Sequence, residues 1–458
     1  MEKKVDVVIV GAGLTGLTTG YYLNKAGKSI LIVDKADRWG GVIETHEESG
    51  FVYEGGPNTG VLSDVIMEDL FEEIQNENCQ IELADTKKAN KRYVVKNGKF
   101  VALPTGPFGG LLTPLFSWRD KFFGIPLEPF RKRGTNPDET LAELVKRRMG
   151  KSMLDYAIDP FILGVYAGDP SQLVPKYALP KLYNLEQDYG SFIGGAIKKM
   201  IATKRKGERS PSRKIFSFKG GLQKMTDGIA SKIGSDKFLL SLSDITVNKT
   251  DSGYQVTGTK AGETVTIEAD KVVTACGGYA LKSLLPFVPQ EDMTNLSNTH
   301  YTKVIEVQLG FNKWNGRELD GFGGLCPFVE NRDILGILFM SATQTNRAPE
   351  SGALLTVFMG GMRRQDLIAK TDMEVKEIVA REVSELMEMP DFNPDMIKIH
   401  RYEHAIPQYG AESKVRFETI DKVEKENSGL TLGGNFCGGI GMSKRVVQGY
   451  EIARKLTT

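Results

Sequence analysis

Three closely spaced glycines near the start of the chain are the residues whose spacing most clearly indicates chemistry. Gly11, Gly13 and Gly16 form a G-x-G-x-x-G pattern after the apolar run at residues 5–10, and Asp34 follows about 20 residues later. Such glycines permit a tight turn, a close approach of pyrophosphate to the backbone, and packing of a helix on the preceding strand. Asp34 would accept hydrogen bonds from ribose hydroxyls. The pattern predicts a dinucleotide site at a helix N-terminus.

A second glycine pair indicates which dinucleotide is bound. Gly40 and Gly41 close the run Asp37-Arg38-Trp39-Gly40-Gly41 and would bring another stretch of backbone to the pyrophosphate. The chain has no second G-x-G-x-x-G and no C-x-x-x-x-C pattern, which argues against a flavin reductase that uses a pyridine nucleotide. This motif resembles that of the FAD-binding flavin amine oxidase superfamily. We therefore expect FAD as the cofactor, bound without a covalent link.

The composition excludes several other classes of protein. Four cysteines and four histidines are scattered through 458 residues without the spacing of metal ligands, so we expect no metal site. The net charge of +1 gives no reason to expect nucleic-acid binding. No run reaches the roughly 18 apolar residues of a membrane-spanning helix. The length predicts two or three domains, in a chain that is cytosolic or rests on a membrane surface.

The apolar pattern predicts an α/β fold that returns to its first sheet. Residues 5–10 and 29–33 read as strands on either side of a helix. Near the C-terminus, a strand pattern at 430–432 leads through glycines to a helix pattern at 443–456. A strand and helix of this kind would rejoin the N-terminal sheet and direct a second helix N-terminus at the cofactor.

Two further stretches stand out by their composition. Residues 105–130 mix glycines and prolines with large apolar side chains, among them Leu115, Phe116, Trp118, Phe122 and Phe123, and are followed by three basic residues. They are either a buried core segment or an interfacial membrane patch with a basic rim. Residues 198–214 carry eight lysines and arginines and one acid, Glu208. We interpret them as a solvated loop that could also contact anionic lipid.

Four separated motifs together resemble the protoporphyrinogen oxidase family within that superfamily. They are DRWGG at 37–41, DPFILGVYAGDP at 159–170, the block at 185–196 with YGSFIGG at 189–195, and GNFCGGIG at 434–441. The GVYAGDP part is the most specific, because other flavin amine oxidases lack it. Arg92-Tyr93 and AIPQYG at 405–410 also fit, so the resemblance runs nearly from end to end.

The resemblance implies an architecture and partners. It implies a Rossmann-like FAD-binding domain assembled from discontinuous segments (1–84, 243–286 and 411–458), an α+β substrate-binding domain (85–120, 206–242 and 287–410), and a helical, membrane-contacting domain (121–205). The chain would be cytoplasmic and peripherally associated with the inner face of the cell membrane. A porphyrinogen, dioxygen, ferrochelatase and a second copy of the chain are the further partners that the resemblance suggests.

The resemblance also assigns roles to residues. Arg92 matches the arginine that meets a substrate propionate, and Gly164 and Val165 match a segment that lines the macrocycle opposite the flavin. Leu325 and Phe339 match apolar positions that sandwich the tetrapyrrole. The alternatives are ordinary core packing for these two and a surface position for Arg92. The residues expected to bind FAD are Gly11, Gly13, Leu14, Thr15, Gly16, Asp34, Lys35, Arg38, Gly40, Gly41, Gly56, Pro57, Asn58, Val247, Gly434, Asn435, Ile440, Gly441 and Met442.

The sequence departs from its relatives at three positions. Ala36 and Val42 stand where many flavin amine oxidases carry arginines near the pyrophosphate. The charge of the pyrophosphate would then be met by backbone amides, the helix dipole, and Lys35 or Arg38. Cys437 stands where relatives often have a larger polar residue, and we expect it near the flavin without a covalent bond.

The implied activity is the oxygen-dependent oxidation of protoporphyrinogen IX to protoporphyrin IX in haem biosynthesis, with release of hydrogen peroxide. Hydride would leave a meso carbon for the flavin, so the cofactor carries the chemistry and no catalytic dyad is expected. Oxidation of coproporphyrinogen III to coproporphyrin III stays open, although its four propionates would require a more basic pocket than Arg92 alone provides. Another oxidoreductase of the superfamily and a flavin-bound scaffold without activity are more distant alternatives.

Overall fold

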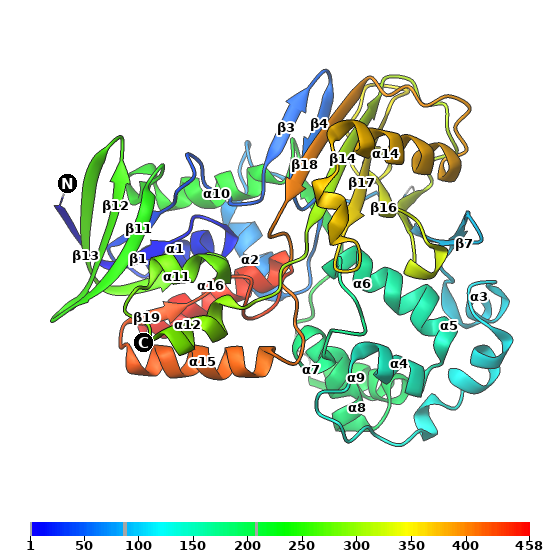
Figure 1. Ribbon diagram of the computed structural model, residues 1–458, viewed down its shortest axis with the longest axis horizontal. Coiled ribbons are helices and arrows are strands. Elements are labelled where there is room, and N and C mark those ends of the chain that lie inside the picture. Colours follow the sequence, from blue (N-terminus) through cyan, green and yellow to red (C-terminus); the bar gives the residue numbers. More distant parts are fainter. Residues whose placement is uncertain (1, 86–88, 207–208) are drawn as a thin grey trace.

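Two seven-stranded sheets form the framework of the molecule. The computed structural model describes residues 2–85, 89–206 and 209–458, and the side chains of these residues except 2, 107, 108 and 202–206. The first sheet lies at the left of Figure 1, the second at the upper right, and a group of helices lies below the second sheet. The predicted roles of Glu208 and of the side chains of Phe108, Lys204, Arg205 and Lys206 lie outside the described part of the chain.

The first sheet is assembled from distant parts of the sequence. Its order is β10-β2-β1-β13-β12-β11, and β19 also pairs with β13. The central strand β1 runs parallel to β2 and β13 and is buried on both faces, which explains its continuous run of valine and isoleucine. The strands span Glu2–Val10 (β1), Ile30–Val33 (β2), Phe238–Leu239 (β10), Ser243–Thr250 (β11), Gly253–Lys260 (β12), Glu263–Thr274 (β13) and Leu430–Leu432 (β19).

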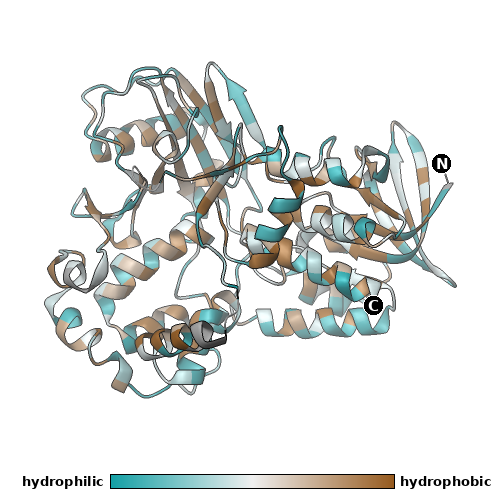
Figure 2. Ribbon diagram, turned by 180° about the vertical axis from the view of Figure 1, so that it is seen from behind, coloured by the Kyte–Doolittle hydropathy of each residue, from teal (hydrophilic) through white to brown (hydrophobic). Residues whose placement is uncertain are grey.

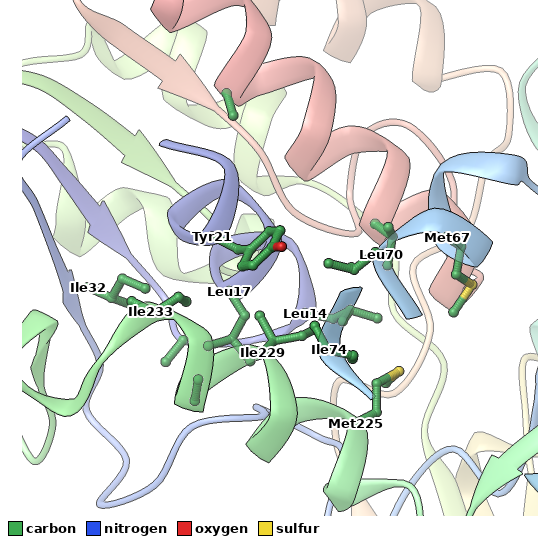
Figure 3. Packing of buried hydrophobic residues seen from close by; sticks show 14 of the residues in the cluster. Leu14, Leu17, Tyr21, Ile32, Met67, Leu70, Ile74, Met225, Ile229 and Ile233 are labelled. Carbon is green, nitrogen blue, oxygen red and sulfur yellow. The ribbon is translucent and has the colours of Figure 1, made fainter. Parts of the chain in front are cut away.

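Helices cover both faces of this sheet. One core cluster joins the sheet to α1, α2, α10 and α16, and Figure 3 shows Leu14, Leu17 and Tyr21 of α1 packed among their partners. The second cluster joins the other face to α11, α12 and α15. The terminal strand and helix thus rejoin the first sheet, as predicted. These helices span Leu14–Lys25 (α1), Val65–Ile74 (α2), Gln223–Ile233 (α10), Leu281–Leu284 (α11), Gln290–Ser297 (α12), Ser413–Glu426 (α15) and Met442–Thr457 (α16).

The second sheet has the order β18-β14-β17-β16-β15-β7-β8. One of its faces packs against α14 (Asp372–Leu386), which begins at a capping box between Thr371 and Glu374. Figure 2 shows hydrophobic residues along the strands of both sheets. The strands span Lys91–Lys96 (β7), Lys99–Ala102 (β8), Val304–Phe311 (β14), Gly321–Leu325 (β15), Ile334–Phe339 (β16), Ala353–Gly360 (β17) and Met396–Tyr402 (β18).

Short elements connect the two sheets. β4 pairs with β3, and β9 pairs with both β5 and β6. The helix α13 follows directly on β16. These elements span Thr45–Glu48 (β3), Phe51–Glu54 (β4), Gly60–Val61 (β5), Ile81–Leu83 (β6), Ile215–Phe218 (β9) and Met340–Thr343 (α13).

The helical group is held together by a buried ion-pair cluster. The Arg148 side chain, fully buried, donates to Glu128 and to Glu186, each at 2.6 Å. These charges satisfy one another inside a region built almost wholly of helices. The helices span Gly106–Leu112 (α3), Leu141–Arg148 (α4), Lys151–Met153 (α5), Asp159–Tyr166 (α6), Pro175–Ala178 (α7), Pro180–Tyr189 (α8) and Phe192–Lys206 (α9).

The structure revises the predicted division of the chain at two places. Residues 216–239 fall in a segment predicted for the substrate domain, yet Phe216 and Met225 belong to the first core cluster and β10 extends the first sheet. The helix α12 falls in another such segment, yet Leu296 packs in the second cluster of the same sheet. Both differences arise because these residues bury their apolar side chains against a sheet that is distant in sequence.

Candidate active site

The glycine turn between β1 and α1 has the geometry that an anion site requires. Gly11 has a φ of +113°, which an L-residue rarely adopts, and a Cβ on Gly16 would lie 1.9 Å from Gly11 O. Gly13 is the N-cap of α1 and offers no side-chain cap. Apart from its chain neighbours, no described residue has an atom within 4 Å of a Cβ built on Gly13, so the space in front of this helix N-terminus is open. The side chain of Leu14 points into the core instead.

Asp34 lies at the end of β2 and braces the glycine turn. Its Oδ2 accepts a hydrogen bond from Ala12 N at 2.7 Å, and its Oδ1 accepts one from Ala36 N at 2.9 Å. The carboxylate is half-buried and therefore keeps an exposed side, as a ribose-binding role needs. The neighbouring Lys35 is exposed. Their contacts with the cofactor stay predictions.

Arg38 shapes the second glycine loop. Its guanidinium donates to Gly41 O at 2.9 Å and to Ile43 O at 3.0 Å, and it pairs with Glu44 at 3.0 Å. Gly40 N donates to Ala12 O at 2.9 Å, so the two glycine loops lie side by side. The charge of Arg38 is thus engaged by protein groups, and its predicted contact with the cofactor has no support in these bonds.

The C-terminal glycine loop brings a second helix N-terminus to this region. Gly441 is the N-cap of α16 and, as at Gly13, no described residue other than its chain neighbours lies within 4 Å of a built Cβ. Asn435 is fixed from two sides, because Tyr409 Oη donates to its backbone O at 2.6 Å and Tyr301 Oη lies 3.2 Å from its Oδ1. Ile440 and Met442 are half-buried. The predicted residues of this loop therefore lie together.

Val247 is the predicted cofactor residue that lies deepest in a core. It pairs with Val256 in the edge strand β11, and its side chain is fully buried in the second cluster. Only its main chain is left for contact with a ligand.

A buried polar network connects the turn at Gly56 and Pro57 to the second sheet. Asn58 Nδ2 donates to Glu306 Oε1 at 2.6 Å and to Gly56 O at 3.0 Å. Gln308 Nε2 donates to the same Glu306 oxygen at 2.9 Å. Both N–H groups of the Asn58 amide are therefore used by the protein, so the predicted contact with the cofactor is left to other atoms of this residue.

The second sheet places two of the predicted substrate residues, Arg92 and Leu325, on one face. Leu325 pairs with Val94 of the neighbouring strand, and Arg92 is two residues from Val94, so the three side chains point to the same side. The helix α6 lies against this face, since a Cβ on Gly164 would be 3.0 Å from Leu325 Cδ2. Val165 beside it is exposed. Arg92 is exposed too, and no described residue offers its guanidinium a hydrogen bond or ion pair.

The predicted role of Phe339 is wrong. Leu325 pairs with Gly336, and Phe339 lies three residues further along that strand, so it points to the opposite face of the sheet. Its ring is fully buried in the cluster with α14, and its centroid lies 6.2 Å from that of Phe100. Leu338 points to the face of Leu325 and is half-buried. The apolar residue that shares the face of Leu325 is thus one position earlier than predicted.

Sequence reasoning also missed two residues of this face, Phe358 and Glu306. They are direct cross-strand partners, and Phe358 in turn pairs with Gly336. Alternation along each strand was visible in the sequence, but the pairing of strands was not. The row that results runs across six strands: Val94, Leu325, Gly336, Phe358, Glu306 and His400.

The most specific sequence block, at residues 159–170, is tied to the second sheet by one arginine. Arg363 Nη2 donates to Asp159 Oδ1 at 2.5 Å and to Asp169 Oδ1 at 3.1 Å, near the two ends of the block. Asp159 Oδ2 also accepts from Phe328 N at 2.9 Å. The acids of this block therefore position α6, and with it Gly164, over the face that carries Arg92 and Leu325.

A comparison with protein families decides which enzymes share this arrangement. The model of flavin-containing amine oxidoreductases matches residues 14–455. The chain belongs to this family. It is accordingly an oxidoreductase whose cofactor is FAD.

Curated relatives match this oxidoreductase over nearly its full length. It is 30% identical to protoporphyrinogen oxidase 1 of Arabidopsis thaliana chloroplasts, an alignment that covers 98% of this chain and 87% of the relative. It is 25% identical to coproporphyrinogen III oxidase of Bacillus subtilis, over 98% of this chain and 97% of the relative. The crystal structure of a protein from Exiguobacterium sp. 255-15 shares its fold, with a TM-score of 0.82, 20% identity and coverage of 99% and 98%.

The residues of this flavin amine oxidoreductase fit a bound FAD. The built Cβ positions at Gly13 and Gly441 are open, and two helix N-termini without side-chain caps offer free N–H groups. Cys437 is buried, and burial raises the pKa of its thiol. Because the thiolate is the reactive form of cysteine, this environment gives no support to a covalent link with the flavin.

Glu306 is an acid whose ionisation the fold opposes. Burial raises its pKa from 4.5 to about 8, and the negative charge of Glu54 acts in the same direction. The hydrogen bonds from Asn58, Gln308 and the Gly56 amide oppose this rise without overcoming it. Below about pH 8, Glu306 is therefore neutral in the folded protein.

Replacing Glu306 with glutamine should remove a pH-dependent cost to stability. Because the folded-state pKa lies above 4.5, the wild type loses stability as the pH rises from about 4.5 to about 8, by up to about 5 kcal/mol. Residue 306 cannot ionise in the glutamine variant. As the pH rises over this range, the free energy of unfolding of the variant should therefore increase relative to that of the wild type. Urea unfolding at pH 5 and pH 8 measures the difference.

Thr356→Val is the matched control for this experiment. Thr356 Oγ1 lies 2.8 Å from Asn58 Oδ1 in the same network but carries no titratable group. Its effect on stability should be the same at both pH values. An equally constant effect for Glu306→Gln would contradict the raised pKa.

Proposed function

We propose that this flavoprotein oxidises protoporphyrinogen IX to protoporphyrin IX in haem biosynthesis, with dioxygen as the acceptor and hydrogen peroxide as a product. The observation that carries the proposal is the face shared by Arg92 and Leu325, with Gly164 of α6 packed over it. Apolar side chains with a cation at one end suit a largely apolar macrocycle that bears carboxylates. The full-length similarity to the Arabidopsis protoporphyrinogen oxidase supports the same substrate.

The roles of the chain follow from this placement. FAD supplies the redox chemistry when bound. Leu325 and Leu338 would contact one face of the macrocycle, and Arg92 would bind a propionate with charge-assisted hydrogen bonds. Gly164 lets α6 approach this face closely, because a larger side chain there would compete with Leu325 for space. The protein thus orients the substrate and excludes water.

Coproporphyrinogen III is the second candidate substrate, favoured by the similarity to the Bacillus subtilis enzyme over 97% of that relative. We expect a preference for protoporphyrinogen IX, because Arg92 is the cation that the predicted site provides. Turnover of the two porphyrinogens, followed by porphyrin fluorescence, distinguishes them. Faster turnover of coproporphyrinogen III would favour it as the substrate. If the FAD-bound protein turned over neither porphyrinogen, both proposed substrates would be rejected.

Arg92→Ala should weaken porphyrinogen binding about ten- to hundredfold, because a charge-assisted hydrogen bond contributes roughly 1.5–3 kcal/mol. Flavin reduction at saturating substrate should change less, because Arg92 grips the edge of the ring. Single-turnover flavin reduction across a substrate titration separates the two effects. Lys91→Ala is the control, since Lys91 pairs with Asp320 at 2.5 Å. An unchanged half-saturation concentration in Arg92→Ala would make Arg92 a surface residue only.

We further propose that residues 111–130, which overlap the start of the predicted helical, membrane-contacting domain (121–205), rest on a membrane. Leu112, Trp118 and Phe130 are 79%, 66% and 84% exposed. Such large exposed apolar side chains, gathered in one short stretch, are typical of interfacial binding. No helix among the described residues is long and apolar enough to cross a membrane.

Two residues of this stretch fit its other interpretation, a buried core segment. Leu115 and Phe116 are buried against Val94 and are core residues. In the basic stretch at 198–214, Arg209 pairs with Asp69 and lies 3.5 Å from Glu68, so this residue is tied to α2. We therefore assign the membrane contact to the exposed residues of 111–130, at the inner face of the cell membrane. Association with ferrochelatase and with a second copy stays a prediction.

Replacing Trp118, Phe122 and Phe123 together with serine should release the protein from lipid vesicles and leave FAD bound. All three side chains are exposed, so the fold should tolerate the change. Vesicle sedimentation measures the bound fraction. Met373→Ser, at an exposed position of α14, is the control and should not alter it. A wild-type protein that never sediments with vesicles would rule out this surface.

A further inference from the structure

Arg445 lies in the first turn of α16, behind the C-terminal glycine loop. Its guanidinium donates to three groups of this region: Gly434 O, Gln448 Oε1 at 2.5 Å, and Cys437 O at 2.9 Å. Its Nη1 also lies 3.4 Å from Thr15 Oγ1, in the first turn of α1. One side chain therefore connects the loop to the glycine turn that the sequence predicts as the pyrophosphate site.

The positive charge of Arg445 has no counter-charge within the described protein. The residue is 8% exposed, and no described carboxylate lies within 4.0 Å of it. Its Nε has no hydrogen-bond partner, and burial lowers its pKa. Buried Arg148 and Arg347, by contrast, each lie against a glutamate. An unpaired buried charge is unfavourable, so a nearby anion would complete this site.

The neighbouring groups define the class of that anion. Gly13 and Gly441 are N-caps of α1 and α16, and neither helix has a side-chain cap. Two helix N-termini and a guanidinium thus lie around one region, an arrangement that suits a phosphate ester with more than one negative charge. FAD carries such a group in its pyrophosphate, whereas its riboflavin part carries none.

We propose that Arg445 supplies the counter-charge for the pyrophosphate of FAD from behind the loop at residues 434–441. Ala36 and Val42 stand where many flavin amine oxidases carry arginines near the pyrophosphate, and Arg445 would supply the positive charge that these two positions lack. Arg38 is occupied by loop carbonyls and Glu44, and Lys35 is exposed, so neither supplies a buried charge. The inference concerns cofactor binding alone and holds whichever porphyrinogen is the substrate.

The test compares two ligands that differ in phosphate. In Arg445→Gln, the affinity for FAD should fall at least about tenfold, while the affinity for riboflavin should stay within about twofold. Dissociation constants come from flavin fluorescence titrations of the full-length protein freed of its cofactor. Arg445→Lys should retain most of the FAD affinity. An equal loss for both ligands would show that Arg445 only supports the loop, and that result overturns the proposal, as does no loss for either.

A second variant tests the same charge without removing the arginine. Gln448→Glu would place a carboxylate against the guanidinium, because Gln448 Oε1 already lies 2.5 Å from Nη1. The new ion pair should keep the fold and neutralise Arg445, so FAD affinity should again fall at least about tenfold with riboflavin unaffected. Unchanged FAD affinity in this variant would also overturn the proposal. Lys444→Gln, at the exposed neighbouring position, is the control and should bind FAD like the wild type.

Discussion

Gly13→Ala is expected to weaken FAD binding about ten- to hundredfold and to leave the fold intact. Gly13 has a φ of −74°, which alanine adopts freely, and the added Cβ would meet no protein atom within 4 Å. The methyl group would instead occupy the space through which the pyrophosphate approaches the N-terminus of α1. Flavin fluorescence titration gives the affinity, and thermal unfolding of the cofactor-free protein gives the stability.

Gly16→Ala is the matched comparison, because its added methyl group would clash with the protein and not with the cofactor. Its Cβ would lie 1.9 Å from Gly11 O, so the helix and the strand would have to separate. We expect this variant to lose stability even without FAD. If Gly13→Ala bound FAD like the wild type, the glycine turn would not be the pyrophosphate site.

Phe339→Ala should destabilise the protein by about 3–5 kcal/mol, because the ring is fully buried in the cluster against α14 and its loss leaves a cavity. Leu338→Ala, one residue earlier, should cost less stability and should raise the half-saturation concentration for porphyrinogen. Urea unfolding and single-turnover flavin reduction measure the two quantities. The reverse result, with substrate binding lost in Phe339→Ala alone, would contradict the assignment of faces.

The sequence alone predicted much of the local structure around the candidate cofactor site. The glycine turn, Asp34, the second glycine pair, and the terminal strand and helix all lie where their patterns indicated. These features are local, since each depends on turn geometry or on periodicity within a few residues. The family also followed from the sequence, because its motifs are short runs whose order along the chain is enough to compare.

Only the tertiary structure decided which side chains share the face of Leu325 and which charges lack a partner of opposite charge. Phe339 and Leu338 exchange roles because a shift of one residue turns a side chain to the other face of a sheet, and the pairing of strands distant in sequence sets that face. Phe116 is core and Trp118 is surface for a similar reason, since burial depends on what packs against each residue. Nothing in the sequence distinguishes the environment of Arg38 from that of Arg445. The charge of Arg38 is used by groups of its own loop, whereas Arg445 is buried among groups from distant parts of the chain without a carboxylate.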